Sequence, residues 1–544
     1  AGTDLAASVS DNTSNSSRIT GEFFLSARKQ FGKFRVEALA GHLFRETQAK
    51  SIGVATGSGG LGIPTVFNVN ARKGEPSVSE GTSMTRLQRY YAKATVGYNG
   101  WLFAEVNANM EDNSVLASAL NFDAKSINYF YPGANVSVIL SDAIPAIKNS
   151  KAISFLKLRA AVAKTGNTNA LGAYSLENTF GNGSNFPYGT LLGYTASNTL
   201  KPATLQPEFV NTTEFGFDLG LNKNKINIEA TYYKQDNSNQ ILTGQASVSS
   251  GFTGILQNAA SFVNEGFEVD LKLTPLFKIN KFNMDFKINY SYQQNKVYKV
   301  LDGGVDELGI GNGNFIIKNY SAYTFKLTDY KRDPEGHVIV DANTGYPSLD
   351  ATPKIFGQTL PKHYLGMTAS FSYERFSLNI VADYRAGAQI YNGIGPDMDF
   401  TGISYRSGQN ARQRFVFPNS VYVDGSGKYV TNTNIYTQSG GYGFWESSAY
   451  NRSINSNYLC SADFWKIREV ALSYNIPVSI FGKHIPIKGA TATLTGRNLF
   501  TFLPKNNEWT DPEFSNTTGN AQGVNSTFNT PPTRIWGANI TLNF

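Results

Sequence analysis

The chain has 544 residues, of which 48 are Lys or Arg and 41 are Asp or Glu, so its formal net charge is +7. Aromatic residues reach 13%, with 37 Phe and 29 Tyr, and so high an aromatic content excludes a disordered chain. A single Cys excludes a disulfide framework and a thiolate metal cluster within the sequence. No apolar run approaches the ~18 residues of a membrane-spanning helix. Charged residues make up only 16%, and the composition favours either a large extracellular β protein or an outer-membrane β-barrel.

Segments of about ten residues alternate between apolar and polar side chains along the whole chain, which is the period of a strand with two different faces. In the last segment Trp536, Ala538, Ile540, Leu542 and Phe544 share one face. The pattern predicts about fifteen strands. In chain order they begin near residues 18, 34, 85, 101, 128, 153, 209, 226, 262, 282, 364, 376, 463, 489 and 533.

The predicted connections alternate in length. Short ones lie at Phe31–Lys33, Asn99–Gly100, Asn222–Lys225 and Glu374–Arg375, with medium ones near 141–153, 275–281 and 475–488. Long ones cover roughly 48–84, 111–126, 164–208, 237–260, 295–362, 387–460 and 504–532. Short turns at one end of the strands and long loops at the other are typical of outer-membrane barrels, whereas a soluble β-sandwich or propeller does not require this alternation. We therefore predict an all-β fold, a transmembrane antiparallel β-barrel with short periplasmic turns and long extracellular loops.

The strand count also bears on domain organisation. Bacterial single-chain barrels have an even number of strands and both barrel ends on the periplasmic side. Counting back from Phe544, an odd total places residues 1–17 on the outer side, and a barrel beginning there would leave an open edge in lipid. We therefore expect residues 1–544 to be the C-terminal portion of a longer barrel protein.

Several stretches resemble the SusC/RagA-type TonB-dependent outer-membrane transporters of Bacteroidota. They follow one another in the family's order from about residue 18 to the end, and the last 80 or so residues are the most specific. The stretches are Leu156–Asn167, Phe215–Asp218 with Tyr232–Lys234, Asn258–Val269, Asp333–Gly336 with Pro353 and Lys354, Asp463–Tyr474, Gly496–Thr501 and Asp511–Glu513.

This resemblance implies a barrel of roughly 22 strands, so that about seven strands, a plug and a TonB box are expected upstream of residue 1. It also implies an importer without enzymatic activity in the outer membrane of a Gram-negative, Bacteroidota-like cell. The expected partners are a SusD-like surface lipoprotein lid, TonB acting through the upstream plug region, outer-membrane lipid, and an oligosaccharide or peptide substrate. Relatives of this type often form dimers of transporter–lid pairs.

Aromatic residues in the longest loops are the candidate substrate-binding residues, because aromatic planes pack on apolar sugar faces and on peptide side chains. The alternatives are packing within the loops and contact with the lid protein. The candidates are Tyr188, Tyr405, Tyr442, Phe444, Trp445 and Trp509.

No catalytic, cofactor or metal site is predicted. Glu268 and Asp270 share one strand face, as a hydrolytic pair would, but regular strand alternation already explains them. Asp333, Glu335 and Asp341 offer oxygen ligands for calcium, but EF-hand spacing is absent and a solvated turn is favoured. Cys460 is expected to be inert, and no Lys or Arg run suits nucleic acid.

The leading functional hypothesis is a TonB-energised importer of oligomeric nutrients. The alternatives are a passive porin, which would share the barrel but lack a plug, and a surface binding or adhesion protein that uses the long loops without transport.

Overall fold

A computed structural model describes residues 7–57, 59–63, 65–119, 127–183, 186, 188–301, 303–482, 486–515, 519, 522–526 and 529–544. Parts of the predicted long loops and residues 1–6 lie outside this range. No helix among the described residues is long and apolar enough to cross a membrane.

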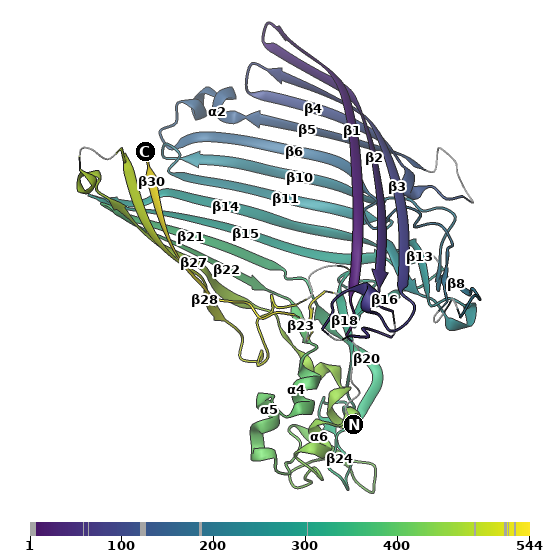
Figure 1. The fold of residues 1–544 in the computed structure, drawn as a ribbon. Helices are drawn as coiled ribbons and strands as arrows, with labels where there is room; N and C mark the ends of the chain where they lie inside the picture. The colour runs from purple at the N-terminus through teal and green to yellow at the C-terminus, as the bar shows by residue number, and fades with distance from the viewer. Residues whose placement is uncertain are drawn as a thin grey trace. The chain divides into compact units, whose positions relative to one another are not determined.

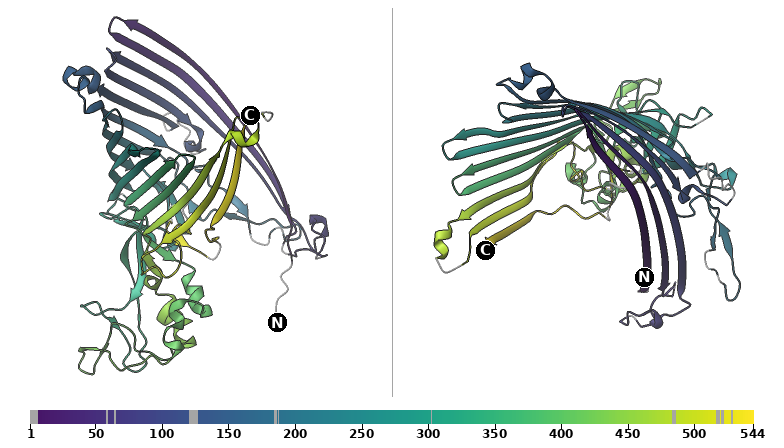
Figure 2. Two further views of the ribbon diagram at one scale, coloured as in Figure 1. Left: turned by 90° about the vertical axis from the view of Figure 1, so that its left-hand side faces the viewer. Right: turned by 90° about the horizontal axis from the view of Figure 1, so that it is seen from above.

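Fifteen antiparallel strands form the main sheet, and neighbours in the sheet are neighbours in this sequence order (Figures 1 and 2). They are β1 (Ser10–Phe31), β2 (Phe34–Ala55), β3 (Ser77–Tyr98), β4 (Leu102–Asn113), β5 (Asn128–Ile139), β6 (Ile153–Asn167), β10 (Glu208–Leu221), β11 (Ile226–Ser238), β14 (Ser261–Ile279), β15 (Phe282–Lys299), β21 (His363–Tyr373), β22 (Phe376–Ala386), β27 (Phe464–Ile476), β28 (Gly489–Phe502) and β30 (Ile535–Asn543). All but β1 and β3 begin within two residues of the predicted positions. The all-β prediction and its strand order are therefore confirmed.

Strands β1 and β3 each begin eight residues earlier than predicted, and with β2 they are 22 residues long. A tilted membrane strand needs only about 9–11 residues. The additional stretch of β1, from Ser10 to Ser17, is polar on both faces and shows no alternation. Its pairing nevertheless continues without a break to Ser10 opposite Ala55, so backbone hydrogen bonding extends the strand where burial gives no sequence signal.

The chain divides into two compact units. Unit 1 comprises Ala1–Ser137, Ala161–Thr212 and Asn237–Ala259, and unit 2 comprises Val138–Ala160, Thr213–Asp236 and Ala260–Phe544.

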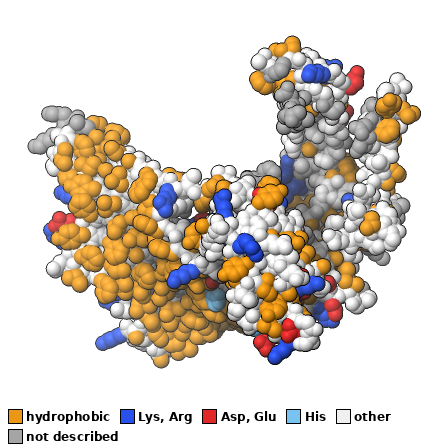
Figure 3. Space-filling model, turned by 90° about the horizontal axis from the view of Figure 1, so that it is seen from below, with side chains coloured by type: hydrophobic (Ala, Val, Ile, Leu, Met, Phe, Trp, Pro, Cys, Tyr) orange, Lys and Arg blue, Asp and Glu red, His pale blue; other side chains and the backbone are white. Residues whose placement is uncertain are grey.

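In both units the two faces of the sheet differ in chemistry. In unit 1, the pairing aligns Leu25, Ala40, Ala92 and Ala108 on one face, while the opposite face carries ion pairs such as Arg89–Glu111 and Lys93–Glu105. In unit 2, Leu271, Ile288 and Met367 align on the apolar face. Hydrophobic side chains gather over a broad continuous area of the surface in Figure 3. Exposed apolar rows on one face and paired charges on the other fit a sheet with lipid on one side and water on the other.

Aromatic residues gather on the apolar face where the strands meet their short turns. Phe34 packs on Tyr98 and Phe376 on Tyr474, each with ring centroids 4.8 Å apart. In unit 2 the pairing places Phe282 opposite Tyr373 and Tyr373 opposite Phe376, so these rings form one row. These rings have the position of an interfacial aromatic girdle.

The short connections are tight turns. Between β14 and β15 only Asn280 and Lys281 intervene, and Asn280 has φ of +52°. Between β21 and β22, Glu374 has φ of +51°. Positive φ at the first loop residue matches the twist of two-residue hairpins. The longer connections at this end carry the short helices α2 (Leu140–Ala143), α3 (Pro145–Lys148) and η7 (Val478–Phe481).

The long loops are folded. Their small sheets are formed by β7 (Phe180–Asn182) and β8 (Tyr194–Ala196); β9 (Thr199–Leu200), β12 (Ile241–Gln245) and β13 (Gly254–Asn258); β16 (Glu307–Gly311), β17 (Asn314–Ile317), β18 (Thr324–Tyr330) and β20 (Leu349–Gln358); β19 (Val338–Ile339), β24 (Ser420–Val423) and β25 (Tyr429–Thr431); and β23 (Gln389–Asn392), β26 (Leu459–Ser461) and β29 (Val524–Asn525). Their helices are η1 (Val69–Ala71), η2 (Ser114–Leu116), η3 (Val248–Ser250), α4 (Gly395–Thr401), α5 (Tyr405–Gly408), η4 (Gln409–Arg412), α6 (Tyr442–Trp445), η5 (Ser448–Arg452) and η6 (Asn455–Tyr458).

Buried hydrophobic clusters lie chiefly in these loops. In unit 1, Leu116, Leu176 and Leu205 belong to one cluster. In unit 2, Phe325 and Leu327 pack with Val524, and Tyr330 and Val338 pack with Ile454. Figure 1 shows α4, α5, α6 and β24 of unit 2 beyond one end of its strands. The loops therefore fold as compact layers, each with its own core, at the end of the strands opposite the short turns.

Candidate functional site

The polar face of unit 2 carries two adjacent rows of side chains that cross four neighbouring strands. One row contains Glu268, Ser291, Tyr364 and Arg385, and the other contains Asp270, Asn289, Gly366 and Asp383. Antiparallel pairing fixes these rows, because residues directly opposite one another point to the same face of a sheet.

A hollow of about 340 Å³ lies over these rows. Gly366 leaves it open: a methyl group built there would meet only the Cβ atom of Asn289, at 4.0 Å. Tyr364 and Arg385 line one side, and the guanidinium of Arg385 lies 5.6 Å from the ring centroid of Tyr364. The hollow therefore combines an aromatic ring with charged side chains on a polar floor.

A β-bulge places one more charge beside the hollow. In β27, Arg468 falls at an irregularity in the pairing with both β22 and β28, between Ile467 and Glu469. Bulges re-aim side chains, and here Arg468 donates two hydrogen bonds of 2.7 Å to the Asp383 carboxylate on the polar face. Strict alternation from Lys466 would send the next residue, Glu469, to the apolar face, whereas the bulge lets both Arg468 and Glu469 lie on the polar side.

Asp511 and Glu513, in the loop that follows β28, complete a charge network with the strands. Arg468 donates two 2.6 Å hydrogen bonds to Glu513, and the nearly buried Lys466 Nζ lies 2.6 Å from an Asp511 oxygen. Arg385 lies 3.2 Å from Glu513. Three cations thus face three carboxylates, counting Asp383 with Asp511 and Glu513.

Burial raises the pKa of Glu513, but hydrogen bonds from Arg468 and Lys466 outweigh that effect and lower the pKa from 4.5 to about 2. The carboxylate is therefore ionised at any physiological pH and fastens its loop to the strands. Both sides of this contact lie in stretches that resemble the family, Asp463–Tyr474 and Asp511–Glu513, but the sequence did not predict the contact itself. Their opposite charges were the available signal.

Two of the loop candidates meet around one arginine. The guanidinium carbon of Arg406 lies 5.7 Å from the ring centroid of Trp445 and 4.8 Å from that of Trp509. Arg406 also forms an ion pair of 2.5 Å with Asp399, whose side chain is fully buried. Tyr458 stacks on Arg406 at 4.6 Å and donates a hydrogen bond to Asp399. These are contacts within the loops, in agreement with the self-packing alternative for Trp445 and Trp509.

The remaining candidates differ in exposure. Phe444 is buried, with 2% exposed, and packs edge-on against Phe415 and Trp445. Tyr188, Tyr405 and Tyr442 are 75–79% exposed. A role in substrate binding stays a prediction for all six, and the three exposed tyrosines are the ones a solute can reach from solvent.

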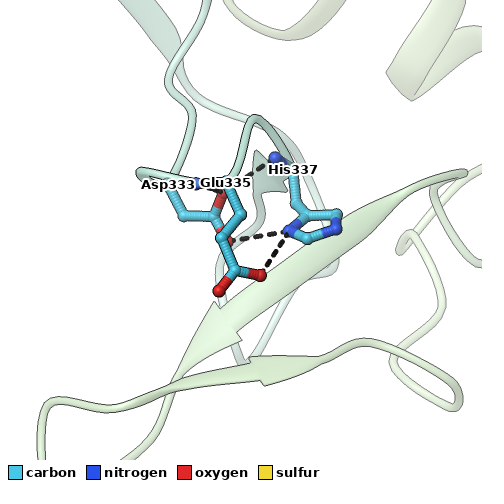
Figure 4. A group of neighbouring side chains, drawn as sticks. All are labelled: Asp333, Glu335 and His337. Atoms are coloured by element: carbon cyan, nitrogen blue, oxygen red, sulfur yellow. Dashed lines mark hydrogen bonds and ion pairs between the residues drawn. The ribbon is translucent and has the colours of Figure 1, made fainter.

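Asp333, Glu335 and His337 bring three ligand-type side chains within 4.8 Å of one another (Figure 4). Asp333 Oδ1 accepts the backbone N–H groups of Glu335 and His337, and Asp333 Oδ2 lies 2.9 Å from His337 Nδ1. Asp341 belongs to a different turn, which it caps by accepting the N–H groups of Asn343 and Thr344. Both aspartates therefore have turn-forming roles, but the Asp333 side chain is buried rather than solvated.

Cys460, in β26, is buried and accepts a hydrogen bond from Asn392. Burial raises the pKa of its thiol to about 11, which disfavours the reactive thiolate.

The family model described as "TonB dependent receptor-like, beta-barrel" matches residues 3–499. The chain belongs to this family. TonB-dependent receptors P3 and P26 of Formosa agariphila are 22% and 24% identical to it. The matches cover 94% and 93% of this chain but 50% and 51% of those proteins, so the chain spans about half the length of these curated relatives.

Among solved structures, the RagAB peptide transporter matches with a TM-score of 0.76 and 18% identity, over 98% of this chain and 56% of that chain. This likeness shows a shared fold. Membership of the TonB-dependent receptor family confirms the predicted barrel fold and outer-membrane location. The family comprises receptors and transporters and is not an enzyme class.

Proposed function

We propose that this TonB-dependent receptor imports oligomeric nutrients, oligosaccharides or peptides, in a step energised by TonB. The proposal assigns the plug and the TonB box to residues outside 1–544. The observation that carries it is the polar face of the sheet, where paired charges and an open hollow lie next to folded loops at one end of the strands. Such a wall is wetted and suits the passage of polar solutes.

The proposal includes a surface lipoprotein as a lid over the loops. Solved structures show the RagAB peptide importer in an "open-open" and in a "closed-closed" state. Three tyrosines on the long loops are exposed, so a lid protein or a solute can contact them: Tyr188, Tyr405 and Tyr442. Co-purification of the full-length protein with a tagged neighbouring lipoprotein, alone or as a dimer of pairs, tests the partnership.

Uptake in cells tests the import function. Cells expressing the full-length protein are supplied with labelled peptides and labelled oligosaccharides, with and without a protonophore. We expect accumulation that depends on the protein and stops when the proton-motive force is lost. Accumulation that survives the protonophore would indicate a porin, and surface binding without accumulation would indicate an adhesion protein.

A further inference from the structure

The connections at the short-turn end of unit 2 carry mostly positive charge. They lie at residues 140–152, 222–225, 280–281, 374–375 and 477–488. Their described residues include two carboxylates, Asp142 and Glu374, and seven cations. The seven cations form a cationic rim: Lys148, Lys151, Lys223, Lys225, Lys281, Arg375 and Lys488. In the long loop at residues 387–463, by contrast, five Lys and Arg residues stand against five Asp and Glu residues. Positive charge is therefore in excess at the short turns.

The side chains of the cationic rim are exposed and have few charged partners within the protein. Lys281 forms an ion pair with Glu374. Among the residues that the structure describes, the other six form no ion pair, and all seven are exposed to solvent. Like charges on a surface repel one another, so an external counter-charge stabilises such a rim. The rim can therefore bind an anion without breaking more than one ion pair of the protein.

The cationic rim lies next to the aromatic girdle of unit 2. Lys281 directly precedes Phe282 in the chain, and Arg375 directly precedes Phe376. Rings of an interfacial girdle lie at the level of the lipid headgroups, and one strand residue advances the chain by only about 3.3 Å. Long Lys and Arg side chains extend from such positions toward the polar layer. The charges of the rim therefore lie at the depth of the headgroup phosphates, on the periplasmic side where short turns of outer-membrane barrels are found.

Exposed apolar side chains accompany the cations on the same connections. Ile480 of η7 is 67% exposed, and Val478 of η7 and Ile144, which lies between α2 and α3, are exposed as well. Cations beside exposed apolar side chains are typical of segments that bind at a membrane interface. A soluble acidic partner would account for the charges but would not require apolar side chains at the edge of the lipid-facing surface. A lipid headgroup layer accounts for both.

We propose that the cationic rim binds anionic phospholipids of the periplasmic leaflet, with its Lys and Arg side chains contacting the headgroup phosphates. Lys223 and Lys225 belong to one four-residue turn and are both exposed, so they can contact the same headgroup. Ile480 and Val478 lie beside Lys488 on one connection and offer apolar contact to the lipid. The barrel wall of unit 2 thereby prefers lipids with a net negative headgroup at its short-turn end.

The experiment is native mass spectrometry of the purified full-length protein in a neutral detergent. Equal amounts of phosphatidylglycerol and phosphatidylethanolamine with the same acyl chains are added, so that the two probes differ in headgroup charge. We expect bound phosphatidylglycerol to exceed bound phosphatidylethanolamine at least about fivefold, the effect of one Lys or Arg near an anionic surface. The preference should fall when ammonium acetate is raised from about 0.05 M to about 0.5 M, because salt screens exposed charges.

Two triple variants connect that preference to the rim. The first removes three rim charges: Lys223→Gln, Lys225→Gln and Lys488→Gln. It should reduce the preference for phosphatidylglycerol at least about threefold. The matched control removes three exposed lysines from long loops at the other end of the strands: Lys331→Gln, Lys428→Gln and Lys505→Gln. It should leave the preference unchanged. The altered gel mobility of an unheated barrel confirms that each variant is folded.

Equal binding of the two lipids by the wild-type protein would overturn the proposal, and this is also the result expected if the rim recruits an acidic protein instead. A preference that survives in the folded rim variant would assign lipid selection to another part of the full-length protein and would overturn it as well. The same loss in both triple variants would show an effect of total charge rather than of the rim.

Discussion

Replacing Glu513 with Gln is the most direct test of the charge network that fastens the loop after β28 to the strands. The substitution keeps the shape of the side chain but removes the charge that Arg468, Lys466 and Arg385 share. The pKa of this carboxyl is lowered from 4.5 to about 2. Each pKa unit corresponds to ~1.4 kcal/mol, so the folded loop favours the ionised form by roughly 3 kcal/mol.

Loss of the Glu513 charge should appear as local opening of the loop after β28, because the rest of that loop has separate contacts at Trp509 and Val524. Amide hydrogen exchange of the full-length protein measures it. A change of roughly 3 kcal/mol corresponds to about a hundredfold faster exchange at Glu513 and Phe514, whose N–H groups bond to Asp511. Exchange in β27 should change far less.

Glu374→Gln provides the matched control. Glu374 pairs with Lys281 at a short turn, where both side chains are well exposed, and such pairs contribute little to stability. Exchange at Glu513 and Phe514 that rises no more in Glu513→Gln than in Glu374→Gln would refute the idea that the network holds the loop.

Acid should reproduce the effect of the substitution. A carboxyl whose pKa is lowered in the folded state stabilises that state above its ordinary pKa of 4.5, and the contribution is lost as pH falls through about 2. We expect the loop amides to exchange progressively faster, relative to intrinsic rates, between pH 4.5 and pH 2. In Glu513→Gln this additional acid dependence should disappear. If it persisted unchanged, another group would be responsible.

Three further predictions concern other parts of unit 2. Asp383→Asn and Glu513→Gln share Arg468 as a partner, so a double-mutant cycle read by exchange should give a coupling energy of at least about 0.5 kcal/mol, and strict additivity would count against a connected network. Ile288→Arg places a charge in an apolar row away from the short turn, and it should lower the free energy of unfolding in lipid vesicles by about 2–4 kcal/mol in a urea titration. Ser370→Arg on the polar face should change that free energy little. Equal changes in the two variants would mean that the faces are misassigned. Arg406→Lys should loosen the loop by roughly 2 kcal/mol, because lysine loses both the planar fork toward Asp399 and the stacking on Trp509, and unchanged exchange at the Trp509 amide would contradict this role.

Sequence periodicity predicted most strands well because a membrane barrel imposes one rule on every strand. A residue faces either lipid or water, so a strand such as β15 shows a regular alternation from its first residue, Phe282, to Tyr292. The rule fails where both faces are wet. Ser10–Ser17 of β1 is polar at every position, so nothing in its composition separates it from a loop.

Periodicity could not predict the structure within the long loops. Strands as short as Val338–Ile339 and Val524–Asn525 have no measurable period, and each pairs with a segment distant in the chain. Their apolar residues were visible in the sequence but not their partners. The aromatic candidates show the same limit: Trp445 and Trp509 are 64 positions apart, and only the three-dimensional structure reveals that both lie near Arg406.

The site depended on two exceptions to alternation. Counting in steps of two along β27 from Lys466 assigns Arg468 correctly to the polar face but then misassigns Glu469, whose pair in the sheet is Arg497. The bulge lets both Arg468 and Glu469 serve the polar side. Gly366 is the second exception, since alternation predicts a side chain at every position and cannot show that an absent one creates space.

The charge network and the hollow share strand β22. Asp383 is the residue that lies in both: it lines the hollow and also receives two hydrogen bonds from Arg468. Because Arg468 and Glu513 neutralise the β22 side, the loop can stay fastened without presenting free cations to a passing solute.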